Sequence, residues 1–177
     1  MSSRSLELDT SRLKLREFVM EDAAFVLQLL NEPSFIEFIG DRGVRTLQDA
    51  ERYLREGPMS SYRQFGHGLL RVSLKDGDIP IGMCGLVKRD TLPNPDIGFA
   101  LLPAYWGQGF VTEAARAVIQ YGREALGKQV ILGITTPGNV RSIAVLKKLG
   151  LSFLEEKPLG DRAEPLKIFS LSVESAP

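Results

Sequence analysis

The alternation of hydrophobic and polar side chains divides the first third of the chain into one strand and several short helices. Leu13 and Leu15 alternate with charged neighbours, which is the period of a half-buried strand. Acidic residues precede the apolar run 23–30, Pro33 opens another short apolar segment, and Thr46-Leu-Gln-Asp49 has the form of a helix cap. This order predicts a strand near the N-terminus followed by short helices.

The rest of the chain alternates strands with two longer helices. The runs 69–74 and 79–88 flank Lys75-Asp-Gly-Asp78, whose Asp-Gly pair is a strong hairpin signal. Further strands are expected at 96–102, 130–134, 151–154 and 168–173, with helices from Thr112 to about Gly127 and from about Val140 to Gly150. Elements in this order imply an α/β (α+β) fold, in which a mixed sheet carries helices on both faces.

Length and composition indicate one ordinary globular domain. The 177 residues are 44% hydrophobic and 25% charged, and we expect a single domain over 1–177 with flexible tails at about 1–7 and 174–177. Basic and acidic residues number 22 each, so no overall positive charge favours direct nucleic-acid binding. No apolar run reaches membrane-spanning length, and the start lacks the apolar core of a signal peptide. These features predict a cytoplasmic protein with no membrane partner.

The single cysteine and the single histidine are each expected to be incidental to chemistry. Cys84 lies in a strand-like apolar run and has no second cysteine with which to form a disulfide, so we expect a small buried hydrophobic side chain. His67 lies between two glycines, where we expect a loop. Its ordinary pKa near neutrality makes it a candidate, but the less specific interpretation is preferred.

A glycine turn lies between the strand expected at 96–102 and the helix expected from Thr112. Gly107 and Gly109 lack a Cβ, so a ligand can approach their backbone closely. The first turn of the next helix has free N–H groups and partial positive charge, which suits a phosphate. The turn lacks the third glycine of a dinucleotide-binding fingerprint, because Thr112 stands in that place.

A second stretch downstream, Asn139-Val-Arg-Ser-Ile-Ala-Val-Leu-Lys-Lys-Leu-Gly150, makes this turn more specific. Together the two stretches resemble the GNAT acetyltransferases, which transfer an acyl group from acyl-coenzyme A to an amine. That family's motif Q/R-x-x-G-x-G/A aligns at Gly109, but Trp106 and Val111 depart from it at the two ends. The Tyr-Trp-Gly-x-Gly-aromatic-x-Thr-Glu-Ala form is similar to the RimJ/RimL-type branch. The resemblance extends from Leu13 to Leu171.

The resemblance implies a mostly antiparallel twisted sheet with a central parallel strand pair that splays apart around the pantetheine arm. Acetyl-CoA is the implied co-substrate, and no metal is expected. The implied pyrophosphate site is the main chain of Gly107, Gln108, Gly109, Phe110, Val111 and Thr112. The main chain of Phe99, Ala100 and Leu101 is implied to pair with pantetheine and to offer an N–H to the thioester oxygen.

Three residues are candidates for catalysis by this resemblance. Asn139 either caps the following helix or lies beside pantetheine and acceptor, and the two roles are compatible. The family often has a tyrosine seven residues after this asparagine, which protonates the leaving thiolate, but here Leu146 stands there. Ser142 is then the best remaining hydroxyl, with a solvated or cap-bonded serine as the alternative. Asp96 is either a base that orients the amine or a surface carboxylate at a strand start.

Four other residues have simpler interpretations. Glu113, in the first helical turn, is expected to stabilise the helix dipole rather than to catalyse. Lys148 either reaches the 3′-phosphate of coenzyme A or belongs to a solvated face. Tyr105 and Trp106 are expected to pack around the cofactor turn rather than to stack on adenine.

The predicted function is N-acetyl transfer from acetyl-CoA to a primary amine, by direct attack in a ternary complex. The acceptor is expected to be a protein N-terminal α-amine or a small-molecule amine, and the protein a monomer or homodimer. Because Leu146 occupies the tyrosine place, a module or sensor that binds acyl-CoA without turnover is the alternative.

Overall fold

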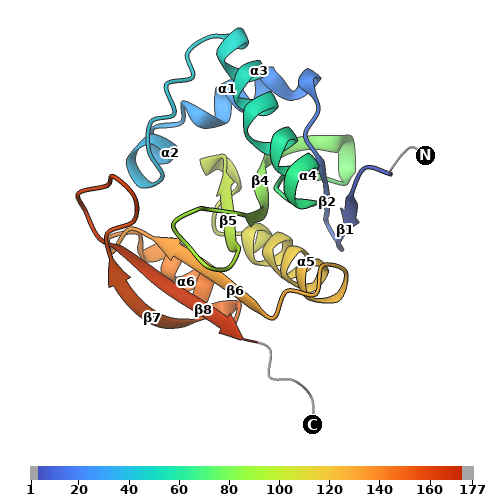
Figure 1. The fold of residues 1–177 in the computed structure, drawn as a ribbon. Helices are drawn as coiled ribbons and strands as arrows, with labels where there is room; N and C mark the ends of the chain where they lie inside the picture. The colour runs from blue at the N-terminus through green and yellow to red at the C-terminus, as the bar shows by residue number, and fades with distance from the viewer. Residues whose placement is uncertain (1–3, 173–177) are drawn as a thin grey trace.

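Eight strands form one sheet within residues 4–172, the part of the chain that this computed structural model describes. Their spatial order is β1-β2-β3-β4-β5-β6-β8-β7 (Figure 1). The strands are β1 (Glu7–Asp9), β2 (Leu13–Glu17), β3 (Leu69–Leu74), β4 (Ile79–Val87), β5 (Asp96–Leu101), β6 (Val130–Thr135), β7 (Ser152–Lys157) and β8 (Leu166–Ser172). Neighbouring strands are antiparallel except for β5 and β6, which are parallel. The mixed, mostly antiparallel sheet predicted from the sequence is confirmed.

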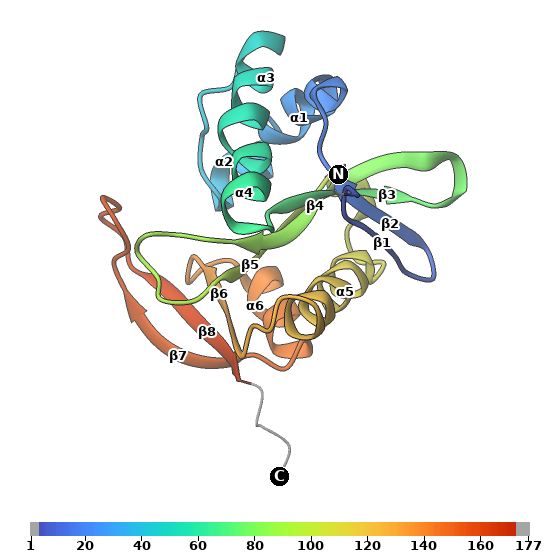
Figure 2. The ribbon, with the colours of Figure 1, turned by 45° about the vertical axis from the view of Figure 1, so that its right-hand side comes forward.

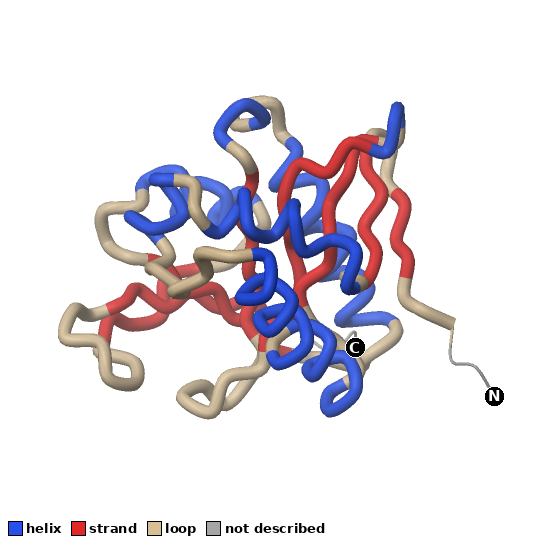
Figure 3. Tube along the Cα trace, turned by 90° about the horizontal axis from the view of Figure 1, so that it is seen from above, coloured by secondary structure: helices blue, strands red, loops and turns tan. Residues whose placement is uncertain are grey.

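The two faces of the sheet carry different helices (Figure 2). One face is covered by α1 (Ala23–Leu30), α2 (Pro33–Phe38), α3 (Leu47–Glu56) and α4 (Pro58–Phe65), which pack around their own apolar core. The other face is covered by α5 (Phe110–Glu124) and α6 (Val140–Lys148). In the view from above, helices overlie the middle of the sheet and strands extend to either side of them (Figure 3).

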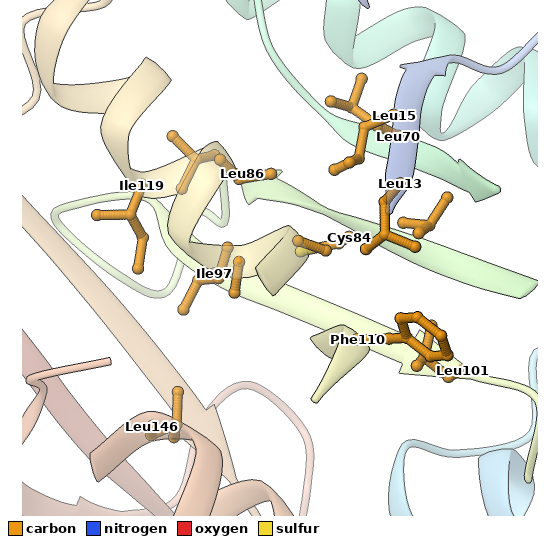
Figure 4. Packing of buried hydrophobic residues seen from close by; sticks show 14 of the residues in the cluster. Leu13, Leu15, Leu70, Cys84, Leu86, Ile97, Leu101, Phe110, Ile119 and Leu146 are labelled. Carbon is orange, nitrogen blue, oxygen red and sulfur yellow. The ribbon is translucent and has the colours of Figure 1, made fainter. Parts of the chain in front are cut away.

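The core under α5 explains how that helix is held. Ala114, Ala115, Val118 and Ile119 are buried at helical spacing and pack with leucines of β2, β3 and β4 (Figure 4). At Gly122 an added Cβ would lie 2.6 Å from Leu86 Cδ1, so a larger residue there would force the Leu86 side chain to shift. The packing fixes the start of α5 relative to β5.

The central parallel pair separates almost at once. Asp96 is registered against Leu132, whose N–H donates to the carbonyl of Pro95 at 2.9 Å, and no further β5–β6 register position follows. β5 instead remains paired with β4 along its whole length, and β6 with β8. The splayed central pair implied by the family resemblance is therefore present.

The structure differs from the sequence-based expectation at several elements and boundaries; β7, for example, extends to Lys157, where the predicted strand ended at 154. Helix α4 was not predicted because Gly57-Pro58 indicates a stop; Gly57 breaks the helix with φ −95° and ψ −100°, but Pro58 then begins a new one. Helix α5 begins at Phe110 rather than Thr112, because Gly109 is already its N-cap. Strand β1 includes Glu7, where a flexible tail was expected. The expectations for Val173 and for the tail 174–177 lie outside the described residues.

Candidate active site

A cleft of about 600 Å³ opens where β5 and β6 separate. It is bordered by the start of α5 and the start of α6 on one face of the sheet, and by α2 and α3 on the other. Of the residues expected at the site, those that line it are Asp96, Phe99, Ala100, Leu101, Gly107, Gly109, Phe110, Val111, Thr112, Asn139, Ser142 and Lys148. Gln108 is the expected residue that does not.

The glycine turn directs main-chain donors into this cleft. Gly107 and Gly109 have φ of +72° and +81°, the left-handed conformation that glycine adopts without strain. The N–H of Glu113 donates to the carbonyl of Gly109, which closes the first turn of α5. The preceding N–H groups, those of 110–112, therefore lack an intrahelical partner and stand at the positive end of a fifteen-residue helix. This geometry suits a phosphate group.

Arg12 braces the turn from the β1–β2 connection, a role that the sequence analysis missed. Its Nη1 donates to the carbonyl of Gln108 at 3.1 Å, and its guanidinium lies 4.3 Å from the centre of the Phe110 ring. Glu113 accepts from Arg12 Nε at 2.9 Å and from the Thr10 hydroxyl at 2.7 Å. Burial raises the pKa of Glu113, but these hydrogen bonds outweigh it, so the pKa is lowered overall. Glu113 thus ties two distant segments together.

The main chain of β5 alternates between its two neighbours. Because Pro95 accepts from β6, the main-chain groups of Ile97, Phe99 and Leu101 face the β6 side, where no strand is paired after Asp96. The Leu101 carbonyl is taken by Trp106 Nε1 at 2.9 Å. The Ala100 carbonyl faces β4, since a Cβ at Gly82 would overlap it. The Phe99 main chain is the part of this set that is left open to the cleft.

Asn139 is the N-cap of α6. Its Oδ1 accepts from the N–H of Ser142 at 3.1 Å, so the capping interpretation is confirmed. Both residues also line the cleft, which keeps the second role of Asn139 open. The Ser142 N–H, rather than its hydroxyl, makes the cap bond.

Leu146, in the family's tyrosine place, points away from the cleft. Its side chain is 1% exposed, belongs to the core, and fills the space in which Gly133 lacks a Cβ. The cleft has other hydroxyls that the sequence analysis did not weigh, including those of Tyr53 and Tyr105. Burial raises the pKa of Tyr53, which makes its phenol a weaker acid than usual.

Asp96 is buried, so the surface-carboxylate alternative is wrong. Its side chain is 1% exposed and accepts from Arg89 Nε at 2.8 Å. Burial raises the pKa of the Asp96 carboxyl, and the Arg89 guanidinium opposes this rise only in part. Side chains alternate along a strand, so Asp96 lies on the same face as Ala100, which packs with the core beneath α1–α3.

The comparisons with known proteins agree with this geometry. Residues 12–152 match the family described as the acetyltransferase (GNAT) domain. The chain belongs to the GNAT acetyltransferase family. It is 28% identical over 146 residues to the uncharacterized N-acetyltransferase YnaD of Bacillus subtilis, with 82% of each chain covered. The family membership confirms the acyl-CoA-dependent N-acetyl transfer expected from the sequence.

Solved structures of GNAT proteins share the fold. An acetyltransferase from Agrobacterium tumefaciens superposes with a TM-score of 0.80 at 24% identity, covering 98% of this chain and 96% of that one. The ribosomal L7/L12 alpha-N-protein acetyltransferase RimL, in complex with coenzyme A, superposes with a TM-score of 0.82 at 12% identity, covering 95% and 98%. At these identities the likeness concerns the fold.

Several residues of this GNAT domain lie apart from its chemistry. His67 is buried and outside the cleft lining, with Nδ1 2.9 Å from the Leu86 carbonyl, and burial lowers its pKa. Cys84 is buried as expected, and burial raises the pKa of its thiol. Trp106, in contrast, lines the cleft, and the guanidinium of Arg141 lies 4.9 Å from its ring centre.

Lys148 lies where the main cleft meets a second hollow, which is also bordered by Arg12 and Arg116. Within residues 4–172, no three His, Cys, Asp or Glu side chains gather as a metal ion would require. No helix among these residues is both long enough and apolar enough to cross a membrane.

Proposed function

We propose that this protein transfers the acetyl group of acetyl-CoA to a primary amine of low pKa, either a peptide α-amine or a similar small-molecule amine. The observation that carries this proposal is the path of the cleft through the sheet. The coenzyme elements α5 and α6 lie on one face and Asp96 on the other, and they meet at the gap beside Phe99. Such a gap lets a thioester and an amine meet without a protein acyl intermediate.

In this proposal main-chain groups hold the coenzyme. The free N–H groups at 110–112 bind the pyrophosphate, and the Phe99 main chain pairs with pantetheine and donates to the thioester oxygen. Negative charge develops on that oxygen in the tetrahedral intermediate, and one such donor is worth about 10²-fold or more in rate. Lys148 contacts the exposed 3′-phosphate.

Ser142, at the start of α6, donates a hydrogen bond from its hydroxyl to the leaving thiolate. A thiol has a pKa of about 8.5, so a hydrogen bond from a hydroxyl suffices and no strong acid is needed. Leu146, which stands in the family's tyrosine place, lies in the core and cannot serve this task. Asn139 holds the first turn of α6, and with it Ser142, at the edge of the cleft.

Asp96 accepts a proton from the amine or orients it. Its raised pKa makes the carboxylate a better base than an exposed aspartate, and Arg89 fixes its orientation. Cys84 has no access to the thioester because it is buried in a strand, which fits direct attack. We place the reaction in the cytoplasm, as expected from the sequence.

The acceptor follows from the pKa of the amine. An α-amine, with a pKa of about 7.8, is neutral in roughly one molecule in seven at pH 7, and a lysine side chain, at about 10.4, in roughly one in 2,500. The difference is on the order of 3.5 kcal/mol, which the site would have to supply for lysine. With one partly neutralised carboxylate as base, the cleft suits the more easily deprotonated amine.

The test is a competition between two peptides, one with a free N-terminus and no lysine, the other N-blocked and containing lysine. Acetylation by acetyl-CoA is followed by mass spectrometry from pH 6.5 to 9.5. We expect the free N-terminus to react faster at pH 7. Faster reaction of the blocked lysine peptide would disprove the preference. Tight coenzyme binding with no product on any amine would favour the binding module instead.

A further inference from the structure

The half of the cleft that remains for the acceptor is rich in arginine. Arg42, Arg89 and Arg162 line it, and Asp96 is the one carboxylate among the described residues that line the cleft. Asp96 is already paired with Arg89. An amine entering this half therefore meets an excess of positive charge.

Arg42 and Arg162 are far apart in the sequence but line the same cleft. Arg42 follows α2, and Arg162 lies in the connection between β7 and β8. α2 and this connection lie side by side in Figures 1 and 2, and both line the same cleft. The α2 side is the face opposite α5, so Arg42, which follows α2, belongs to the face that holds Asp96.

These two arginines line the cleft without a carboxylate partner in the part of the chain that the structure describes, unlike the paired arginines of the chain. Arg12, Arg16, Arg45 and Arg71 each have a carboxylate partner. Arg42 and Arg162 have no ion pair or hydrogen bond within residues 4–172, although Asp41 is adjacent to Arg42; Asp41 pairs with Arg45 instead. Two guanidinium groups without protein partners at one mouth of a cleft can receive an anion.

We propose that the acceptor amine carries a negatively charged group, a carboxylate or a phosphate, which Arg42 and Arg162 bind while the amine faces Asp96. This inference rests on the proposed function and names its substrate class. A guanidinium offers paired N–H donors that match the oxygens of either group, and such charge-assisted hydrogen bonds are stronger than neutral ones. The same positive charge disfavours the protonated amine and so increases the fraction that can attack.

The inference is tested with acceptors that differ only in charge. One pair of peptides has Asp or Asn as the second residue, and a second pair has phosphoserine or serine there, so that the α-amine is kept while the carboxylate and the phosphate are tested separately. The wild-type protein is expected to favour the acidic member of at least one pair in kcat/KM. An equal or higher kcat/KM for the neutral members of both pairs would overturn the inference while leaving the proposed function in place.

Variants connect the preference to the two arginines. The double change Arg42→Gln with Arg162→Gln is expected to lower kcat/KM for the acidic acceptor on the order of tenfold more than for the neutral acceptor, mainly through KM. Arg123→Gln, an exposed arginine on α5, is the matched control. Arg42→Glu should reverse the charge preference. An equal loss for acidic and neutral acceptors, or none for either, would refute the assignment, and unchanged acetyl-CoA affinity by calorimetry shows that the coenzyme end is intact.

Discussion

The two ends of the cleft differ in the kind of chemical group that lines them. At the proposed coenzyme end the groups assigned to the ligand are main-chain N–H and C=O groups of the glycine turn, of β5 and of the first turn of α5. At the acceptor end they are side chains, above all Asp96, Arg42 and Arg162. The coenzyme end is the same for every acyl transfer from coenzyme A, whereas the acceptor end sets which amine reacts.

This difference determines how each end can change. Main-chain groups survive most substitutions, provided that the backbone keeps its path, so the coenzyme end depends on a few glycines. Side-chain groups change with single substitutions and come from loops that tolerate variation. We therefore expect coenzyme binding to be lost when the backbone of the glycine turn is disturbed, and acceptor recognition to be lost when charged side chains are replaced. The following variants test this expectation.

Gly109→Asp should have the largest effect, a loss of acetyl-CoA affinity on the order of a thousandfold. The new carboxylate would stand beside the pyrophosphate, and like charges in contact cost several kcal/mol. Gly127→Asp is the control, because Gly127 also has a positive φ and open space around it, but lies after α5 and away from the cleft. If calorimetry showed wild-type affinity for acetyl-CoA in both variants, the pyrophosphate assignment would be wrong.

Asp96→Asn should lower kcat about 100-fold and change its dependence on pH. Burial raises the pKa of Asp96, so wild-type kcat should fall as the pH drops through that raised pKa and the carboxylate is protonated. The asparagine cannot titrate, so this limb should be absent from its kcat profile between pH 5 and 8. Asp90→Asn is the control, because Asp90 lies in the connection just before β5 and is exposed. A limb that persists in Asp96→Asn would assign the titration to another group.

Leu146→Tyr should not create the missing acid. The position is in the core against Gly133 and Leu151, so a larger ring overpacks it and lowers the free energy of unfolding by about 1–3 kcal/mol. Leu154→Tyr, on the exposed strand β7, should be close to neutral. Chemical denaturation measures both. A stable Leu146→Tyr protein with raised kcat would mean that the side chain reaches the cleft.

Ser142→Ala should give the smallest effect, about a tenfold loss of kcat with little change in KM. The thiolate needs only a hydrogen bond, and that bond strengthens as charge develops on sulfur. The capping bond uses the N–H of Ser142 and survives the change. Ser152→Ala on β7 is the control. A rise in KM alone would make Ser142 a binding residue.

The sequence predicted the coenzyme end better than the acceptor end. Gly107, Gly109 and Asn139 are informative because only a few residue types fit a positive φ or a helix cap, so their spacing can be recognised. The burial of Asp96 could not be read in this way. It depends on Arg89, which the 88–95 connection returns to the start of β5, and a charged residue before a strand is ordinarily exposed.

The same limit applies to the residues that sequence reasoning missed. Arg12 acts on a turn that begins 95 residues later, and no local pattern marks that contact. Arg42 and Arg162 meet only because α2 and the β7–β8 connection are brought together by the fold. Among the elements, the apolar alternation predicted β2 and the β3–β4 hairpin, whereas α4 was hidden because a Gly-Pro pair both ends one helix and begins the next.

A cleft that passes through the sheet has two openings. In the proposed function acetyl-CoA enters from the face of α5 and the acceptor from the face of α2, so neither substrate would stand in the other's route to solvent. Under this arrangement we expect no steric constraint on the order of binding: either substrate can bind first and either product can dissociate first. The order in which the two products leave would therefore depend on their separate dissociation rates and not on an obligatory order of release.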